Sequence, residues 1–314
     1  MARRKKGDPV HGWVVIDKPA GLTSTDVVTR VRRALNAQKA GHAGTLDPLA
    51  TGILAVALGE ATKTIPFVMD AEKVYRFTVR WGEARATDDA EGEVVATCDK
   101  RPSREEILIA LPEFTGEIAQ VPPAFSAVKV DGERAYDLAR AGETVELKAR
   151  PVWIGEILII AQPDADHAEF EMLCGKGTYV RSFARDLAQR LGTVGHVSAL
   201  RRLRAGPFSE DQAISLDNFM TSARSPDGQT ALLPLKTALD DIPALAVAEG
   251  DAARLRSGQS VLVRGRTFIE AQQLIEDGGV PVVLATGLRG DPIALTELDR
   301  GELRPVRVFN LSTA

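Results

Sequence analysis

The sequence is poor in residues that cross-link a chain or bind a metal. Its 314 residues include two cysteines, Cys98 and Cys174, which lie far apart and form no CxxC pair. This spacing predicts neither a disulfide framework nor a zinc knuckle, and it is typical of a reducing compartment. A chain of this length buries enough apolar surface to fold without covalent links, and it accommodates one large domain and a small one.

Long hydrophobic runs are missing too. The basic start, MARRKK, continues into GDPVHGWVVIDKP without the apolar stretch of a secretory signal. No run approaches the ~18 apolar residues that a membrane-spanning helix requires. We therefore expect a cytoplasmic protein without a membrane partner.

The glycine-rich motifs of nucleotide-binding folds are also absent. The chain contains no GxGxxG, and GKGTY at 175–179 is no P-loop, because Gly177 follows Lys176 where a Ser or Thr is required. Strand and helix patterns are mixed without a regular βαβ alternation. We predict an α+β fold around a mixed, mostly antiparallel sheet.

The small negative net charge, −4, conceals a segregation of charge along the chain. Residues 1–50 hold nine Lys and Arg against four Asp and Glu, and residues 171–206 hold seven against two, while the other segments are acidic. If the two basic segments meet in space, they form a positive groove suited to a phosphate backbone. The alternative is solvated charge on separate helix faces.

Hydrophobic periodicity predicts the main elements. Strands are expected at 13–16, 53–59, 73–81, 152–160 and 167–174, and helices are expected around Val27 to Leu35, from Ser103, at 134–142, and from Val180 to Gly192. Residues 209–245 lose periodicity and gain prolines, which indicates a linker. The short β-rich runs after it are typical of a small barrel. We place the domain boundary between 1–235 and 236–314.

One stretch, GHAGTLDPLATGI at 41–53, reads as a loop built to present a single carboxylate, Asp47. One histidine, His42, and one carboxylate are too few ligands for a metal site, so no metal is expected. A glycosidase would need a second acid, which the sequence does not reveal. Asp47 is then a lone nucleophile or base, or a turn-forming Asp before proline.

Several motifs in order resemble the TruB family of tRNA pseudouridine-55 synthases. They are DKPAGLTS, GHAGTLDPLATGILAVALGEATK, KVYRF, GKGTYVRS and HVSALRRLR, which together span residues 13–206. The tail resembles the small RNA-binding PUA barrel through PIALTEL and GELRPVRVFN, although its acidic balance is unusual for a nucleic-acid binder.

The resemblance implies isomerisation of uridine to pseudouridine in the T-loop of tRNA. The base leaves the ribose at N1, rotates and rejoins through C5. No atom is gained or lost, so no cofactor is expected. The partner implied is tRNA, with no obligate protein partner, and we expect a monomer. Because the target lies inside a folded loop, it must be extruded at a cost of a few kcal/mol.

The resemblance also assigns roles to residues. Asp47 matches the catalytic carboxylate, and Arg181 matches its arginine partner, expected to lower the Asp47 pKa by ~1–3 units. Tyr75 matches the aromatic residue that stacks on the uracil and assists removal of the C5 proton. The remaining site residues fall at matching positions: His42 in the space left by the flipped nucleotide, Tyr179 and Leu200 around the base, Lys18 in a structural role and Lys63 at a phosphate.

Each of these residues also has an ordinary explanation. A loop histidine, an aromatic on an alternating strand and a helix arginine more often satisfy the fold than a ligand. Two other functions fit the motifs as well. One is an RNA-guided synthase of the dyskerin type, and the other is a tRNA-binding or folding module in which the Asp47 loop is a relic.

Overall fold

The computed structural model of the chain describes residues 7–126, 129–130, 133–134, 147–223, 231–275 and 282–311. The α-helices are α1 (Ser24–Ala34), α2 (Ile65–Asp70), α3 (Arg104–Ala110), α5 (Val180–Arg190), α6 (Leu216–Ser222), α7 (Glu249–Arg256) and α8 (Arg266–Ile275). Short 3-10 helices are η1 (Gly59–Thr64), η2 (Leu111–Phe114), η3 (Glu210–Gln212) and η4 (Leu235–Leu239).

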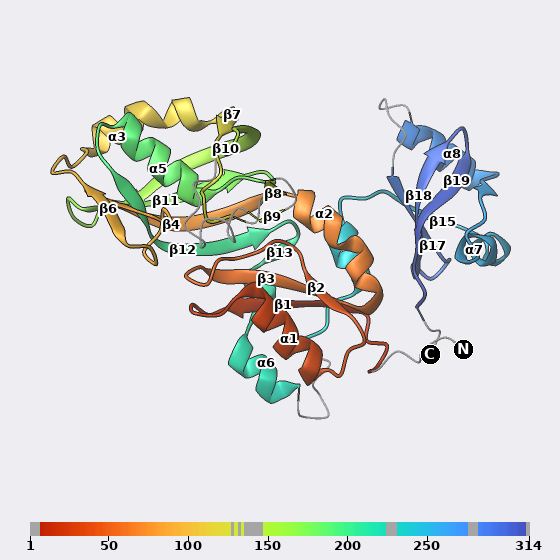
Figure 1. Cartoon of the computed structure of the whole chain (residues 1–314). Coiled ribbons are helices and arrows are strands. Elements are labelled where there is room, and N and C mark those ends of the chain that lie inside the picture. Colours follow the sequence, from red (N-terminus) through yellow and green to blue (C-terminus); the bar gives the residue numbers. More distant parts are fainter. Residues whose placement is uncertain are drawn as a thin grey trace.

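Ten strands among these residues form one mixed sheet (Figure 1). They are β1 (Gly12–Lys18), β2 (Ala40–His42), β3 (Thr51–Leu58), β4 (Lys73–Trp81), β7 (Gly116–Gln120), β10 (Arg150–Ala161), β11 (His167–Cys174), β12 (Gly195–Ala205), β13 (Phe208–Ser209) and β14 (Ile214–Ser215). The order is β14-β1-β3-β12-β4-β11-β10-β7, with β2 on β3 and β13 on β12. Only the β1/β14 and β3/β12 pairs in it are parallel, which confirms the predicted fold class.

The loop that carries Asp47 lies near the parallel pair of β3 and β12, where two halves of the sheet meet. On one side, α1 and α6 pack on β1 and β3 around a core that includes Val27, Val31 and Phe219. On the other side, α3 and α5 cover β4, β10 and β11, where Phe77 stacks on Phe170 and meets Phe183 edge-on. Each half thus has its own core.

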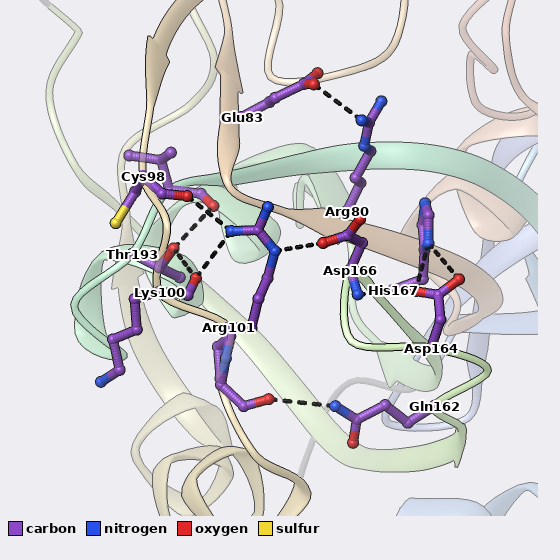
Figure 2. A network of polar contacts seen from close by, with 12 residues as sticks. Arg80, Glu83, Cys98, Lys100, Arg101, Gln162, Asp164, Asp166, His167 and Thr193 are labelled. Carbon is purple, nitrogen blue, oxygen red and sulfur yellow. Dashed lines mark hydrogen bonds and ion pairs between the residues drawn. The ribbon is translucent and has the colours of Figure 1, made fainter.

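The smaller pairings are β5 (Glu83–Arg85) with β6 (Val94–Thr97) and β8 (Lys129–Val130) with β9 (Glu133–Arg134). Figure 2 shows the polar contacts that hold the chain just after β6. Arg101 donates to the Cys98 carbonyl and pairs with Asp166, while Thr193 donates to the Lys100 carbonyl at 2.9 Å. The Asp166 pair connects the chain after β6 to the β10–β11 turn, and the Thr193 bond connects it to the turn between α5 and β12.

The C-terminal part forms a five-stranded curled half-barrel, which confirms the small β domain expected from the sequence (Figure 1). Its strands are β15 (Ala244–Ala246), β16 (Val261–Leu262), β17 (Val282–Thr286), β18 (Pro292–Asp299) and β19 (Glu302–Val308). Leu235 and Leu239 of η4 share a hydrophobic cluster with Trp13 of β1 and Leu284 of β17. The segment at the predicted boundary therefore packs against both parts.

Most predicted elements are present, including the strand 73–81 with alternating burial and the Ser103 to Glu106 capping box. Gly192 follows α5 with φ +72°, as expected for a residue one position past a helix C-cap. The linker prediction for 209–245 is wrong: β14 pairs with β1, and α6 buries Leu216 and Phe219. Apart from Arg134 in β9, the helix predicted at 134–142 lies outside the described residues.

Candidate active site

The Asp47 loop joins β2 to β3 and is held from both sides. The Ser24 hydroxyl, at the start of α1, donates to the Leu46 carbonyl at 3.0 Å and accepts from the Leu46 amide at 2.8 Å. Lys18, fully buried at the end of β1, donates to the Pro48 carbonyl at 3.2 Å and to the Leu22 carbonyl at 2.7 Å. The residues on either side of Asp47 are thus fixed, and Lys18 has the structural surroundings that its predicted role requires.

Arg181 meets Asp47, as the sequence analysis expected. Its guanidinium reaches the Asp47 carboxylate at 2.9 Å, and it also donates to the Thr87 carbonyl at 2.9 Å and the Phe125 carbonyl at 3.0 Å. The Arg181 side chain is 7% exposed and that of Asp47 is 35% exposed. The arginine is therefore fixed inside the protein, whereas one side of the carboxylate faces an accessible space.

A third charged residue, Asp89, was missed by sequence reasoning. Its carboxylate lies 3.3 Å from Arg181, is nearly fully buried, and also bonds the Thr87 hydroxyl and the Glu91 amide. Beside it, Asp88 pairs with Arg185 at 3.0 Å. The ATDDAEG segment carries no recognisable motif, so only an indirect argument could have indicated Asp89. A buried arginine requires a negatively charged side chain beside it.

The pKa of Asp47 is raised above its ordinary value, which corrects the expectation of a net lowering. Burial is the main cause, and the charge of Asp89 adds to it. Arg181 and Lys18 act in the expected direction and lower the Asp47 pKa, but they do not outweigh the loss of solvent. Asp47 is consequently a stronger base than an exposed aspartate.

Two predicted base-contacting residues, Tyr75 on β4 and Leu200 on β12, lie where the two halves of the sheet meet. Both are partly buried, and both pack against the cores on either side of the junction. Burial raises the pKa of Tyr75, and the charge of Arg202 opposes that rise. Their contact with the target base stays a prediction.

His42 and Tyr179 border the same region. His42 ends β2, directly before the Asp47 loop, and its pKa is lowered by burial and by the charge of Arg202, so its imidazole is neutral near pH 7. Tyr179 immediately precedes α5, and its backbone is held by Gln120, which donates to the Tyr179 carbonyl at 3.2 Å and accepts from its amide at 2.8 Å. Gln120 thereby fixes the helix end that carries Arg181.

Lys63 is the one predicted residue that lies elsewhere. Its ammonium pairs with Glu60 at 2.6 Å and donates to the Val308 carbonyl of β19 at 2.7 Å. Glu60 also accepts from the Asn310 amide at 2.8 Å. Lys63 thus connects η1 to the C-terminal part, and its phosphate contact stays a prediction.

Most cations of residues 171–206 form ion pairs with carboxylates of the same chain. Six of its seven cations pair with carboxylates: Lys176 with Asp70, Arg181 with Asp47 and Asp89, Arg185 with Asp88, Arg190 with Glu113, Arg201 with Asp17 and Glu210, and Arg204 with Glu72. A positive groove made by this segment together with residues 1–50 would have to draw most of its free charge from the latter.

No group of three or more His, Cys, Asp or Glu side chains within the described ranges is arranged to hold a metal ion. None of the helices in the same ranges is long and apolar enough to cross a membrane.

Comparison with known proteins identifies the family. Residues 32–180 match the TruB family pseudouridylate synthase N-terminal domain, and residues 181–240 match the tRNA pseudouridylate synthase B C-terminal domain. The tRNA pseudouridine synthase B of Caulobacter vibrioides is 56% identical over 312 residues, covering 99% of this chain and 100% of that protein. The one of Bradyrhizobium diazoefficiens is 57% identical, covering 99% of this chain and 89% of that protein.

Solved structures agree on the fold. An H/ACA RNP bound to a substrate RNA containing 2′-deoxyuridine matches with a TM-score of 0.71 at 21% identity, over 99% of this chain and 92% of that chain. A Cbf5-Nop10-Gar1 complex matches with a TM-score of 0.71 at 23% identity, over 98% and 91%. At these identities the likeness concerns the fold alone. The full-length sequence relatives decide the identity: the chain belongs to the TruB family of pseudouridylate synthases, enzymes of the isomerase class.

Proposed function

We propose that the chain isomerises the uridine at position 55, in the T-loop of tRNA, and that Asp47 is the catalytic carboxylate. The relatives that match over their full length are named tRNA pseudouridine synthase B, which supports tRNA as the substrate. The observation that carries the proposal is the ion pair between Asp47 and Arg181, in which the Asp47 side chain is 35% exposed.

Asp47 can act in three ways on such a substrate. It can attack C1′ of the ribose, attack C6 of the base, or take a proton from C2′. Each route requires the ionised carboxylate, and Arg181 and Lys18 supply the positive charge that favours it. The raised pKa makes Asp47 a better base or nucleophile once it is ionised.

Arg181 orients this carboxylate. Its guanidinium is held by two backbone carbonyls and by Asp89, so its position does not depend on Asp47. A rigid partner of this kind reduces the reorganisation needed as charge moves during the reaction. We infer that Asp89 is a positioning residue that acts through Arg181.

The target base must leave the tRNA stack to reach Asp47, and extrusion costs a few kcal/mol. Tyr75 and Leu200, partly buried at the sheet junction, offer apolar surface that recovers part of this cost through stacking. The neutral His42 is placed beside the loop to take the space of the flipped nucleotide. Residues 236–314 are proposed as the RNA-binding domain, after a catalytic domain of residues 1–235.

The test uses an unmodified tRNA transcript and purified protein, without guide RNA or other proteins. The expected result is one pseudouridine per transcript at position 55, and none in a transcript with cytidine there. Asp47→Asn should bind tRNA normally and form no product. The matched control is Asp211→Asn, since Asp211 is exposed on η3 and should leave the rate unchanged.

Each outcome separates the alternatives. Product that appears only with a guide RNA would favour an RNA-guided synthase. Tight binding without any product from the wild type would favour a tRNA-binding module. Product formed by Asp47→Asn would remove Asp47 from the role of nucleophile or base.

A further inference from the structure

Arg202, on β12, is a buried cation that the proposed mechanism leaves unused. It is 1% exposed, and no carboxylate in the described part of the chain lies within 4.0 Å of its guanidinium, unlike the other six cations of residues 171–206. A buried charge without a counter-ion is costly. The hydrogen bonds and neighbours of Arg202 therefore indicate its role.

The first set of contacts holds the Asp47 loop. Arg202 donates to the Ile53 carbonyl at 2.7 Å and to the Gly44 carbonyl at 3.1 Å, so one guanidinium binds the chain on both sides of Asp47. The Arg202 backbone lies beside Gly52 in the parallel β3/β12 pair. Gly52 has φ +96°, and a Cβ there would lie 2.2 Å from the Arg202 carbonyl oxygen, so this close approach requires glycine.

The second contact is with Tyr75. Arg202 lies directly opposite Tyr75 in the antiparallel pair of β12 and β4. Residues directly opposite in such a pair point to the same face, with Cβ atoms about 4.5–5.5 Å apart. Both side chains are thus turned into the interior at the sheet junction, next to the Asp47 loop.

Arg202 also sets the electrostatic surroundings of the Tyr75 phenol. Burial raises the pKa of Tyr75, and Cys174 on β11 and Asp47 in the loop raise it further. The charge of Arg202 acts in the opposite direction. Other titratable groups near Arg202 are Lys18, His42 and Lys73, and each of their pKa values is lowered in part by its charge.

We propose that Arg202 is a positioning residue for the isomerisation: it ties the Asp47 loop to β12, and its charge increases the small ionised fraction of Tyr75. This inference rests on the proposed function. After the base has rejoined the ribose through C5, the Tyr75 phenolate takes the C5 proton. The electrons of the broken C–H bond form the C5=C6 double bond, and the π electrons of the N1=C6 bond move to N1, which takes a proton from water. The phenol then gives its proton to the hydroxide left behind, which restores the phenolate.

The first test is made on RNA-free protein. The chain has three tyrosines, so uniform labelling with the more acidic 3,5-difluorotyrosine gives a small set of ¹⁹F NMR signals, and that of Tyr75 is assigned with Tyr75→Phe. In Arg202→Gln, which keeps a hydrogen-bond donor but no charge, the acidity of residue 75 should fall at least about tenfold. Arg202→Lys, which keeps the charge, should leave it within about threefold of wild type.

Arg204→Met is the matched control, because this arginine of the same strand is 38% exposed and pairs with Glu72 at the surface. Its titration of residue 75 should equal that of the wild type. An unchanged acidity in folded Arg202→Gln would overturn the proposal. If circular dichroism shows that Arg202→Gln does not fold, Arg202→Lys provides the test. A tenfold loss of the acidity of residue 75 in Arg202→Lys would also overturn the proposal.

The second test measures single-turnover rates on tRNA. Arg202→Gln should react at least about tenfold more slowly at pH 7.5 and bind tRNA within about threefold of wild type. A rate equal to wild type would contradict the role of Arg202. Failure of the wild type to modify position 55 would instead contradict the proposed function, and it would leave the fluorine titration unaffected.

Discussion

At the scale of single residues, Asp47 has its charge set by opposing effects. Loss of solvent and the Asp89 carboxylate raise its pKa, while Arg181 and Lys18 lower it. Sharing one guanidinium between two carboxylates holds Arg181 in place but leaves less of its charge for Asp47. The ionised form of Asp47 is thus less stabilised than it would be by an unshared arginine, but the position of Arg181 is fixed. Such a loss of stability is common where residues serve a reaction.

This balance predicts how stability depends on pH. A folded pKa above the unfolded value of 3.8 means that the folded protein holds the Asp47 proton more tightly. Stability is therefore lost as pH rises from 3.8 through the folded pKa. Asp47→Asn cannot ionise, so its free energy of unfolding minus that of the wild type should grow across this window and then become constant. Urea titrations between pH 3 and pH 7.5 measure this difference.

Asp26 provides a control with the opposite sign. Its hydrogen bonds with Thr23 at the start of α1 lower its pKa below 3.8. Its stabilising contribution is present above that value and is lost as pH falls through the folded pKa. Asp26→Asn should accordingly lose stability relative to the wild type as pH rises through this lower window. A flat or falling difference for Asp47→Asn would contradict the raised pKa.

The sequence could predict Asp47 and Arg181 because each stands in a motif of its own. Nothing in the sequence indicated Asp89 or Gln120, whose roles depend on the hairpin and on β7 folding against α5. Arg202 lies inside a recognised motif, HVSALRRLR, but its neighbour Arg201 is equally basic. Only the register of β12 against β3 and β4 shows which of the two is buried.

At the scale of elements, α5 shows where periodicity reaches its limit. Its apolar stripe predicted the face that packs on β4 and β12. Arg181 and Arg185 lie together on the other face, which an amphipathic pattern assigns to solvent. The loop carrying Asp88 and Asp89 covers that face instead, and its distance in sequence from α5 made the cover unpredictable.

The segment 209–223 shows the opposite error, since a stretch with little periodicity is part of the core. Phe219 of α6 is fully buried beside Val27 and Val31 of α1. Phe219→Ala should therefore lower the free energy of unfolding by about 3–5 kcal/mol. Asn218→Ala, at an exposed position of the same helix, should change it by less than about 0.5 kcal/mol. Equal small effects in urea titrations would restore the linker interpretation.

At the scale of the whole molecule, four exposed cations without a counter-ion in the described part of the chain lie at or just after the C-terminal end of α1. Arg30, Arg32, Arg33 and Lys39 are exposed and, within the ranges that the structure describes, lie in no ion pair of 4.0 Å or less. The Gly7 carbonyl accepts from Gln38 at 3.0 Å.

This distribution predicts which arginines contribute to the salt dependence of tRNA binding. Cations already paired within the protein release few counter-ions from RNA, whereas free ones release them on contact with phosphate. The double variant Arg32→Gln/Arg33→Gln should reduce the slope of log K against log salt by about 1.4–1.8, the value for two phosphate contacts. Filter binding or fluorescence anisotropy over a range of salt concentrations measures this slope.

The matched control removes the same charge from ion pairs at the surface. Arg190 and Arg204 pair with Glu113 and Glu72, so Arg190→Gln/Arg204→Gln frees two carboxylates and should leave the salt slope nearly unchanged. Both double variants carry the same net charge, which separates local contacts from a general field effect. Equal reductions in the two would show that tRNA senses overall charge, and a larger reduction in the control would place the RNA on the α5 and β12 side instead.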